Sequence, residues 1–251
     1  MSLLTVERIK LASTRSPYWC LGAILFAALV FALLFGLINQ GENAAPFFVL
    51  QGVGLGQSVF MILAALAVTT EYRFNTIKET FLAAPRRLTV LLAKTGLLAG
   101  LGALTGFVAA MAAFFLAKAL ATNPPSPLVL QGEVWRQTAG YAALFAIAAV
   151  IAVAVGVLVR QSAGAVSIVL VWTLVLEGLI SIIPTAGPKI AKWLPFRAGN
   201  EFIQPRSTDV IGSNGPPTSI ELGPVGGLLV FLAWAVVLWV IAAVVLQRRD
   251  A

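Results

Sequence analysis

The sequence contains six long apolar segments, and no other feature constrains its fold as strongly. They cover roughly residues 17–38, 53–70, 95–117, 137–159, 163–183 and 224–246. Each is close to the ~20 residues with which an α-helix crosses the hydrocarbon core of a bilayer. Hydrocarbon offers no hydrogen-bond partners, so the backbone must satisfy its own polar groups. Barrel strands are shorter and alternate in polarity, which these segments do not. The sequence therefore predicts an all-α membrane protein with six transmembrane helices in one domain, residues 1–251.

The composition argues against a soluble protein and against most enzymes. Only 11% of the residues are charged, whereas soluble domains have about 25%. The chain has no histidine and a single cysteine, Cys20, so it lacks the commonest general base and the commonest metal ligand. A Ser-His-Asp hydrolase is disfavoured for the same reason. We therefore expect no catalytic residue, no metal site and no cofactor bound by this chain.

The basic residues predict how the spans are oriented. Segments that share the amino-terminal side hold Arg8, Lys10, Arg15, Arg73, Lys78, Arg86, Arg87, Lys94, Arg160, Arg248 and Arg249. Connections on the other side hold Lys118, Arg136, Lys189, Lys192, Arg197 and Arg206. Because loops rich in Lys and Arg stay in the cytoplasm, both termini are predicted to be cytoplasmic. Orientation thus explains the net charge of +7 without a nucleic-acid partner, and the expected location is a bacterial plasma membrane.

Two segments outside the spans have patterns of their own. The amino-terminal stretch SLLTVERIKLASTRSPYW puts Leu3, Val6 and Ile9 on one side at helical spacing. It predicts an amphipathic helix over 1–16 that lies on the inner membrane face, with a frayed tail as the alternative. In the outer connection 184–223, prolines bracket an apolar stretch in PTAGPKIAKWLPF. This pattern suits an interfacial or re-entrant segment, with an ordinary surface loop as the alternative.

The third span carries two GxxxG spacings, Gly96 with Gly100 and Gly102 with Gly106, on different faces of the helix. Small residues let membrane helices approach closely, and in lipid such packing replaces the hydrophobic effect. The two spacings indicate either packing inside the bundle or contact with a second copy of the chain.

The connection EYRFNTIKETFLAAPRR, at 71–87, is unusually charged for this chain. Phe74, Ile77 and Phe81 recur at helical spacing while polar residues occupy the other side, so we predict a short amphipathic helix. Pro85 would end it. A simple orientation signal needs basic residues but has no use for the acidic residues and the apolar stripe.

This stretch resembles the cytoplasmic loop between the second and third spans of ABC-2 type ABC transporter permeases, with its Glu-Tyr-Arg, Gly-Thr-Ile and Pro-Arg-Arg pattern. Asn75 stands where that family usually has glycine. The chain is also similar to the family in ERIKLASTRSPYW, its amino-terminal helix, and in RQSAGAVSIVLVWTLVLEGLISIIP, its fourth-to-fifth connection and fifth span. KWLPFRAGN is similar to its outer loop. The resemblance therefore extends over the whole chain.

The resemblance implies a permease subunit that pairs with a second permease copy, identical or a sibling, and binds two ABC ATPase subunits in the cytoplasm. In that family the loop after the second span acts as a coupling helix and docks on the ATPase, together with the amino-terminal helix. The coupling residues carried over are Glu71, Tyr72, Arg73, Thr76, Ile77, Pro85, Arg86 and Arg87. No G-x-x-x-x-G-K-[ST] phosphate loop occurs in the chain. ATP and Mg²⁺ are therefore expected on the partner chain, and this chain is not expected to be an enzyme.

Glu177 is the one Asp, Glu, Lys or Arg within the six predicted spans. A charge at mid-membrane costs about 3 kcal/mol on insertion scales, so this side chain should face protein or water. Thr173 and Ser181, at i−4 and i+4, extend it into a polar stripe, and Gln57 and Ser58 lie at comparable depth on the second span. These residues either line a substrate pathway, as the resemblance implies for the second and fifth spans, or tie helices together through hydrogen bonds.

The favoured function is export of a hydrophobic or amphipathic compound, such as multidrug efflux, driven by the partner ATPase. A related ABC-2 subunit that serves self-protection, or lipid or cofactor export, fits the same residues. An ion-coupled secondary transporter with Glu177 as its proton site is an alternative of a different class and would need no ATPase. A membrane-embedded enzyme fits poorly, because no acid-base pair can be assembled from one acid and no histidine.

Overall fold

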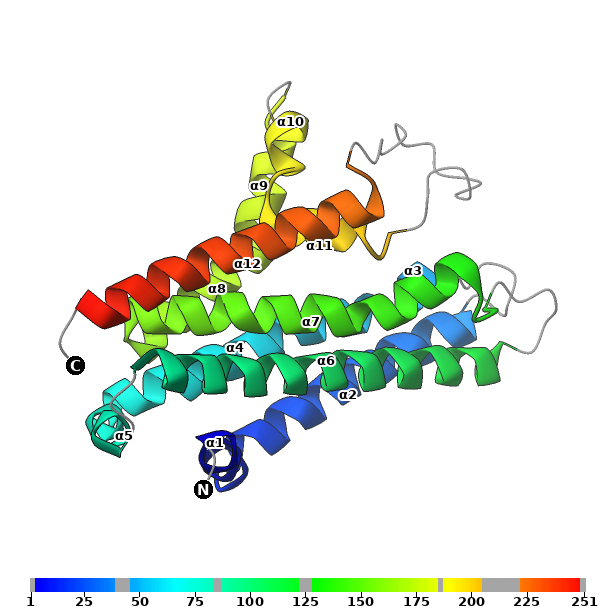
Figure 1. Cartoon of the computed structure of the whole chain (residues 1–251). Coiled ribbons are helices and arrows are strands. Elements are labelled where there is room, and N and C mark those ends of the chain that lie inside the picture. The colour runs from blue at the N-terminus through cyan, green and yellow to red at the C-terminus, as the bar shows by residue number, and fades with distance from the viewer. Residues whose placement is uncertain are drawn as a thin grey trace.

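The structure, a computed structural model, describes residues 3–38, 46–83, 87–121, 128–184, 187–204 and 222–248. All regular secondary structure in these ranges is helical (Figure 1). The elements are α1 (Leu3–Ala12), α2 (Ser16–Ile38), α3 (Pro46–Val49), α4 (Gln51–Arg73), α5 (Thr76–Ala83), α6 (Arg87–Leu120), α7 (Gly132–Val159), α8 (Ser162–Val171), the π-helical turn η1 (Trp172–Leu176), α9 (Glu177–Ile182), α10 (Gly187–Ala191), α11 (Pro195–Glu201) and α12 (Gly223–Arg248). The predicted all-α class is confirmed for this part of the chain.

Six helical segments of the described chain are long and apolar enough to cross a membrane. They are Ser16–Leu37, Pro46–Arg73, Arg87–Leu120, Gly132–Val159, Ser162–Ile182 and Gly223–Arg248. Their number and order agree with the prediction, but several run beyond the apolar segments. Helix α6 has 34 residues and is about 50 Å long, so it exceeds the ~30 Å hydrocarbon core. Lys94, expected just before the third span, is part of this helix.

The second and fourth spans form the centre of the bundle. In their most apolar 18-residue stretches, 67% and 61% of the residues are buried, compared with 22% in the first and in the sixth. Phe60 of α4 and Phe145 of α7 are fully buried, and their ring centroids lie 5.8 Å apart. The first and sixth spans therefore present most of their side chains to the surroundings of this chain.

Glycines mark the closest helix contacts. A side chain at Gly52 of α4 would collide with the backbone of Ala27 in α2, and a Cβ atom at Gly106 of α6 would lie 2.5 Å from the carbonyl oxygen of Tyr141 in α7. A Cβ atom at Gly102 would lie 2.9 Å from the carbonyl oxygen of Phe145 in α7, so this GxxxG spacing serves packing inside the bundle. In contrast, a Cβ atom at Gly96 or Gly100 would meet no atom within 4 Å. The other GxxxG spacing therefore faces open space in the single chain.

The fifth span is not one regular helix, because η1 interrupts it between α8 and α9. Only 17% of its most apolar stretch is buried, and α9 and α10 project away from the other helices (Figure 1). Helix α11 returns to the bundle and packs on α12, where the rings of Phe196 and Phe231 lie 5.5 Å apart. That this connection re-enters the membrane stays a prediction, and residues 185–186 and 205–221 lie outside the described ranges.

The described ends of the chain and α5 lie at the same end of the bundle (Figure 1). A helix, α1, forms where the amphipathic pattern predicted one. Val6 and Ile9 of its predicted apolar side are exposed, whereas Glu7 is buried against the bundle. The position of α1 on a membrane face stays a prediction.

We expect Gly106→Ala to lower the stability of the protein and Gly96→Ala to leave it unchanged or raise it. The added methyl group at residue 106 would lie 2.5 Å from the Tyr141 oxygen, and such overpacking costs about 1–3 kcal/mol. At residue 96 the methyl group has free space, and alanine favours a helix over glycine by about 1 kcal/mol. Melting temperatures of the purified variants in one detergent measure the difference. Equal melting temperatures would contradict the α6–α7 contact.

Candidate functional site

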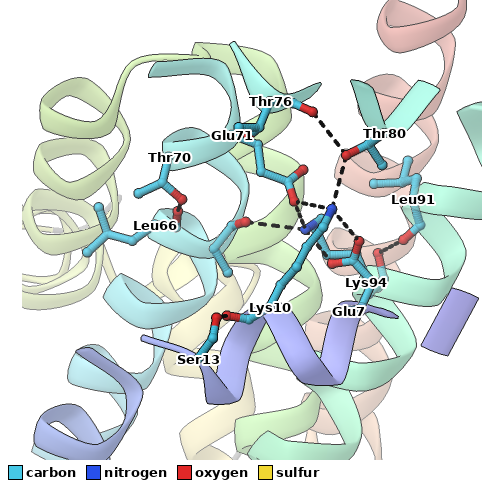
Figure 2. A network of polar contacts seen from close by, with 12 residues as sticks. Glu7, Lys10, Ser13, Leu66, Thr70, Glu71, Thr76, Thr80, Leu91 and Lys94 are labelled. Carbon is cyan, nitrogen blue, oxygen red and sulfur yellow. Dashed lines mark hydrogen bonds and ion pairs between the residues drawn. The ribbon is translucent and has the colours of Figure 1, made fainter. Parts of the chain in front are cut away.

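Four charged side chains meet between α1, α4 and α6 (Figure 2), at the end of the bundle where the described part of the chain begins and ends (Figure 1). Glu7 and Lys10 belong to α1, Glu71 to the end of α4 and Lys94 to α6. The side chains of Glu7, Glu71 and Lys94 are only 5%, 9% and 8% exposed, and that of Lys10 is 38% exposed. We call this set the four-charge cluster. Its two carboxylates and two ammonium groups balance, so the cluster has no net charge.

Lys94 lies at the centre of the four-charge cluster. Its Nζ is 2.6 Å from Glu7 Oε2 and 2.9 Å from Glu71 Oε1. It also donates a hydrogen bond to the carbonyl oxygen of Ala67, at 3.3 Å. An ammonium group has three N–H donors, so all donors of this buried lysine are used. Lys94 thereby holds α1 and α4 to α6.

Lys10 completes the four-charge cluster and links it to α5. Its Nζ is 3.0 Å from Glu71 Oε1 and 3.3 Å from Glu7 Oε1, and it donates to Thr80 Oγ1 of α5 at 3.0 Å (Figure 2). Burial, the largest single effect, lowers the pKa of Lys10, but the charges and hydrogen bonds of Glu71 and Glu7 outweigh it and raise the pKa above 10.5. Because the pKa is raised in the folded state, the contribution of Lys10 to stability is complete below pH 10.5. That contribution is lost only as the pH rises further. The contacts of Lys10 therefore persist at neutral pH.

Helix α5 follows α4 through a turn in which Asn75 has a left-handed backbone, with φ of 57°. Left-handed backbone favours glycine, and asparagine is among the few other residues that adopt it readily. Asn75 is thus compatible with the turn at the position where the resembling family has glycine. A helix is present where the sequence predicted one, and its role as a coupling helix stays a prediction.

The junction of α4 and α5 presents a mixed polar and apolar surface. Arg73 and Thr76 are exposed, as are the apolar side chains of Phe74 and Leu82, which are 67% and 85% exposed. Ile77 is buried. The predicted apolar stripe is therefore divided, because Ile77 faces the protein while Phe74 faces outward, as does the nearby Leu82.

The other predicted coupling residues that are described face the protein. Glu71 belongs to the four-charge cluster, and Tyr72 lies beneath the guanidinium group of Arg160, whose Cζ is 5.1 Å from the ring centroid. Arg87 donates a hydrogen bond to the carbonyl oxygen of Leu246, at 3.2 Å, and so links α6 to α12. Outside the described residues lie Pro85, Arg86 and the side chain of Phe81.

A cavity of about 200 Å³ lies toward the opposite end of the bundle, between α4, η1 and the α11 region. It brings together three of the five predicted pathway residues, Gln57, Ser58 and Thr173. Gln57 is buried, and its amide makes no hydrogen bond to another described residue. Phe47 and Phe196 add aromatic surface. The cavity is thus lined by polar side chains, which also include Gln51, Asn200 and Gln204, as well as by apolar ones.

Glu177 and Ser181 do not line this cavity. The Glu177 carboxylate accepts hydrogen bonds from the backbone N–H groups of Phe196, at 3.0 Å, and Arg197, at 2.6 Å. These groups lie in the first turn of α11, where N–H groups have no partner within their own helix. The Ser181 hydroxyl donates to the carbonyl oxygen of Gly178 in its own helix. This geometry matches the helix-tying interpretation of Glu177.

The sequence pattern did not predict the four-charge cluster. Glu7 and Glu71, the partners of Lys94, lie 87 and 23 residues before it in the chain, so no local spacing connects them. One signal does point to the cluster. Lys94 is followed directly by a long apolar run. Placing an unpaired ammonium group beside hydrocarbon costs enough free energy that a carboxylate partner is expected.

No protein-family model matches the chain, and no curated protein matches its sequence significantly. The function is therefore argued from the residues and their geometry.

We expect Lys94→Met to destabilise the protein strongly. It leaves the buried carboxylates of Glu7 and Glu71 without the ammonium group between them, and removing one partner of a buried pair costs about 3–5 kcal/mol. Thermal unfolding in detergent measures the loss. Lys118→Met is the matched control, because Lys118 is exposed near the other end of the same helix. Adding Glu71→Gln to Lys94→Met should restore part of the loss, and a Lys94 variant as stable as the Lys118 control would contradict the cluster.

We expect Glu177→Gln to loosen the start of α11. A neutral amide accepts through one oxygen only, so one of the two backbone N–H groups loses its partner, at a cost of about 1–3 kcal/mol. Hydrogen exchange at the amides of Phe196 and Arg197 should become faster. Ser181→Ala is the control, because its hydroxyl bonds only within its own helix. Unchanged exchange in Glu177→Gln, with transport abolished, would instead favour the pathway interpretation.

Proposed function

We propose that this chain is the membrane subunit of an ABC-2 type exporter, working with a second permease copy and with separate ATPase subunits. The observation that carries the proposal is the connection of α5 to the spans. This eight-residue helix lies between two of them and exposes Leu82, next to the exposed Arg73 and Phe74 that precede it. It is bonded through Thr80 to the four-charge cluster. Such an element can bind a partner on one side and move the spans on the other.

The four-charge cluster supports a mechanical role for α5. A buried ion pair separates only at a large cost, because each charge would be left unpaired in a poorly solvated place. Lys10 contacts α5 and α4, and Lys94 contacts α1 and α4 from α6. A displacement of α5 by an ATPase would therefore move α1, α4 and α6 together as one rigid element.

We propose that the end of the bundle with the four-charge cluster faces the cytoplasm. Of the 17 basic residues in the chain, eleven belong to the sequence segments of this end and six to those of the other end. The positive-inside rule places such an end in the cytoplasm. An ATPase there would reach α5 directly, and ATP with Mg²⁺ would bind to that partner.

The cavity beside Gln57, Ser58 and Thr173 is proposed as part of the substrate route. Its volume of about 200 Å³ is below the roughly 300–1,000 Å³ of ordinary small-molecule sites, so a larger site needs a further wall. A second permease copy placed against the exposed apolar side chains of the fifth span, such as Leu174 and Leu179, would provide one. Walls that combine polar and apolar side chains suit an amphipathic compound.

An ion-coupled transporter with Glu177 as its proton site has less support. Both carboxylate oxygens of Glu177 accept backbone hydrogen bonds from α11, so this side chain is engaged inside the protein, and it does not line the cavity.

The proposal predicts that an ATPase co-purifies with the chain from native membranes and that Arg73→Glu with Leu82→Asp removes it. Both side chains are exposed on the α4–α5 junction, so the fold should survive the changes while the docking surface is lost. Lys118→Glu is the control, because it changes an exposed charge on the end of α6 away from α5. The readouts are the ATPase bound per permease and the melting temperature of the permease.

Two results would overturn the proposed function. One is retention of the full amount of ATPase by the Arg73 and Leu82 double variant. The other is transport by the purified chain in vesicles under an ion gradient with no nucleotide present.

A further inference from the structure

A large apolar groove runs along α6 on the side away from α7. Its volume is about 1120 Å³, and α1 and α2 form its walls with residues that include Leu4, Leu11 and Leu21. Along α6 it extends from Thr89 to Leu104, a distance of about 22 Å. The groove is therefore longer than one leaflet, which is half of the ~30 Å hydrocarbon core, and it opens at the surface of a membrane span.

The floor of the groove is formed by Gly96 and Gly100. A Cβ atom at either position would meet nothing within 4 Å. At Gly102 and Gly106, in contrast, side-chain and backbone atoms of neighbouring helices occupy the space that a Cβ atom would need. The small residues at 96 and 100 thus leave a smooth surface that no described part of the chain covers. In a bilayer such a surface is covered either by lipid or by another protein.

Arg8 is the only charged residue among the described residues that line the groove. It is exposed and has no hydrogen bond or ion pair to another described residue, unlike Glu7 and Lys10 beside it in the four-charge cluster. A guanidinium group binds phosphate through two parallel hydrogen bonds. The groove therefore combines an apolar channel with an anion-binding group at the end formed by α1.

We propose that the groove binds one anionic phospholipid, with its phosphate on Arg8 and an acyl chain over Gly96 and Gly100. Charge decides between a lipid and a second copy of the chain. Of the acidic residues that the structure describes at this end, Glu7 and Glu71 are used within the four-charge cluster, which leaves only the exposed Glu79 of α5. A second copy would thus bring mostly positive charge toward Arg8, whereas an anionic headgroup complements it. The proposal does not depend on the ABC-2 assignment.

Native mass spectrometry of the purified full chain tests the proposal with two added lipids, phosphatidylglycerol and phosphatidylcholine of the same acyl composition. We expect the first phosphatidylglycerol to bind more tightly than phosphatidylcholine. Arg8→Gln should weaken phosphatidylglycerol binding roughly fivefold, which corresponds to one basic residue at an anionic lipid, and should leave phosphatidylcholine unchanged. Gly100→Leu fills the floor and should weaken both lipids.

Matched controls separate the groove from the general surface. Arg15→Gln removes an exposed charge from the α1–α2 connection, and Gly22→Leu adds a side chain to α2 where nothing lies within 4 Å; neither residue lines the groove. Both variants should bind lipid as the unchanged protein does. Equal phosphatidylglycerol binding by Arg8→Gln and Arg15→Gln, or by Gly100→Leu and Gly22→Leu, would overturn the proposal.

A second measurement detects a protein occupant. With Cys20 replaced by serine, Gly100→Cys provides a single thiol on the floor of the groove. A disulfide-linked dimer formed in native membranes would show that a second copy covers the floor and would overturn the proposal. If lipid covers the groove, the variant should stay monomeric, with its thiol unpaired.

Discussion

Hydrocarbon provides no hydrogen-bond partner, so a charged side chain inside the bundle is stable only where it finds partners in the protein. Lys94 meets this requirement with Glu7, Glu71 and a carbonyl oxygen, and Glu177 meets it with two backbone N–H groups of α11. In both places a polar side chain joins segments that are distant in sequence.

Close packing at small residues is the second source of cohesion, and α6 uses it on one side only. Gly102 and Gly106 bring α6 against α7, while Gly96 and Gly100 stay uncovered. Since helices in lipid gain little from burying apolar surface against each other, such contacts depend on shape. The covered side of α6 holds the bundle together, and the uncovered side provides the proposed lipid site next to α1.

The two ends of the bundle differ in how firmly they are held. At one end, the four-charge cluster joins three helices and reaches α5 through Thr80. At the other, the fifth span is lightly buried and contains the π-helical turn Trp172–Leu176, a feature often found at functional sites. A rigid end that receives force and a less buried end that lines a cavity fit the proposed division of work in an exporter.

Local hydrophobicity and periodicity were sufficient to predict an all-α chain, six spans in the correct order and a short helix between the second and third, because these features depend on residues near in sequence. The same patterns grouped Glu71 with the exposed Arg73, and Glu177 with Thr173 and Ser181. Folding separated both groups: Glu71 pairs inside the four-charge cluster, and Glu177 caps α11. Which charge is buried depends on partners up to 87 residues away in the sequence. Only the packing of the helices brings such partners together, so no local sequence pattern could predict them.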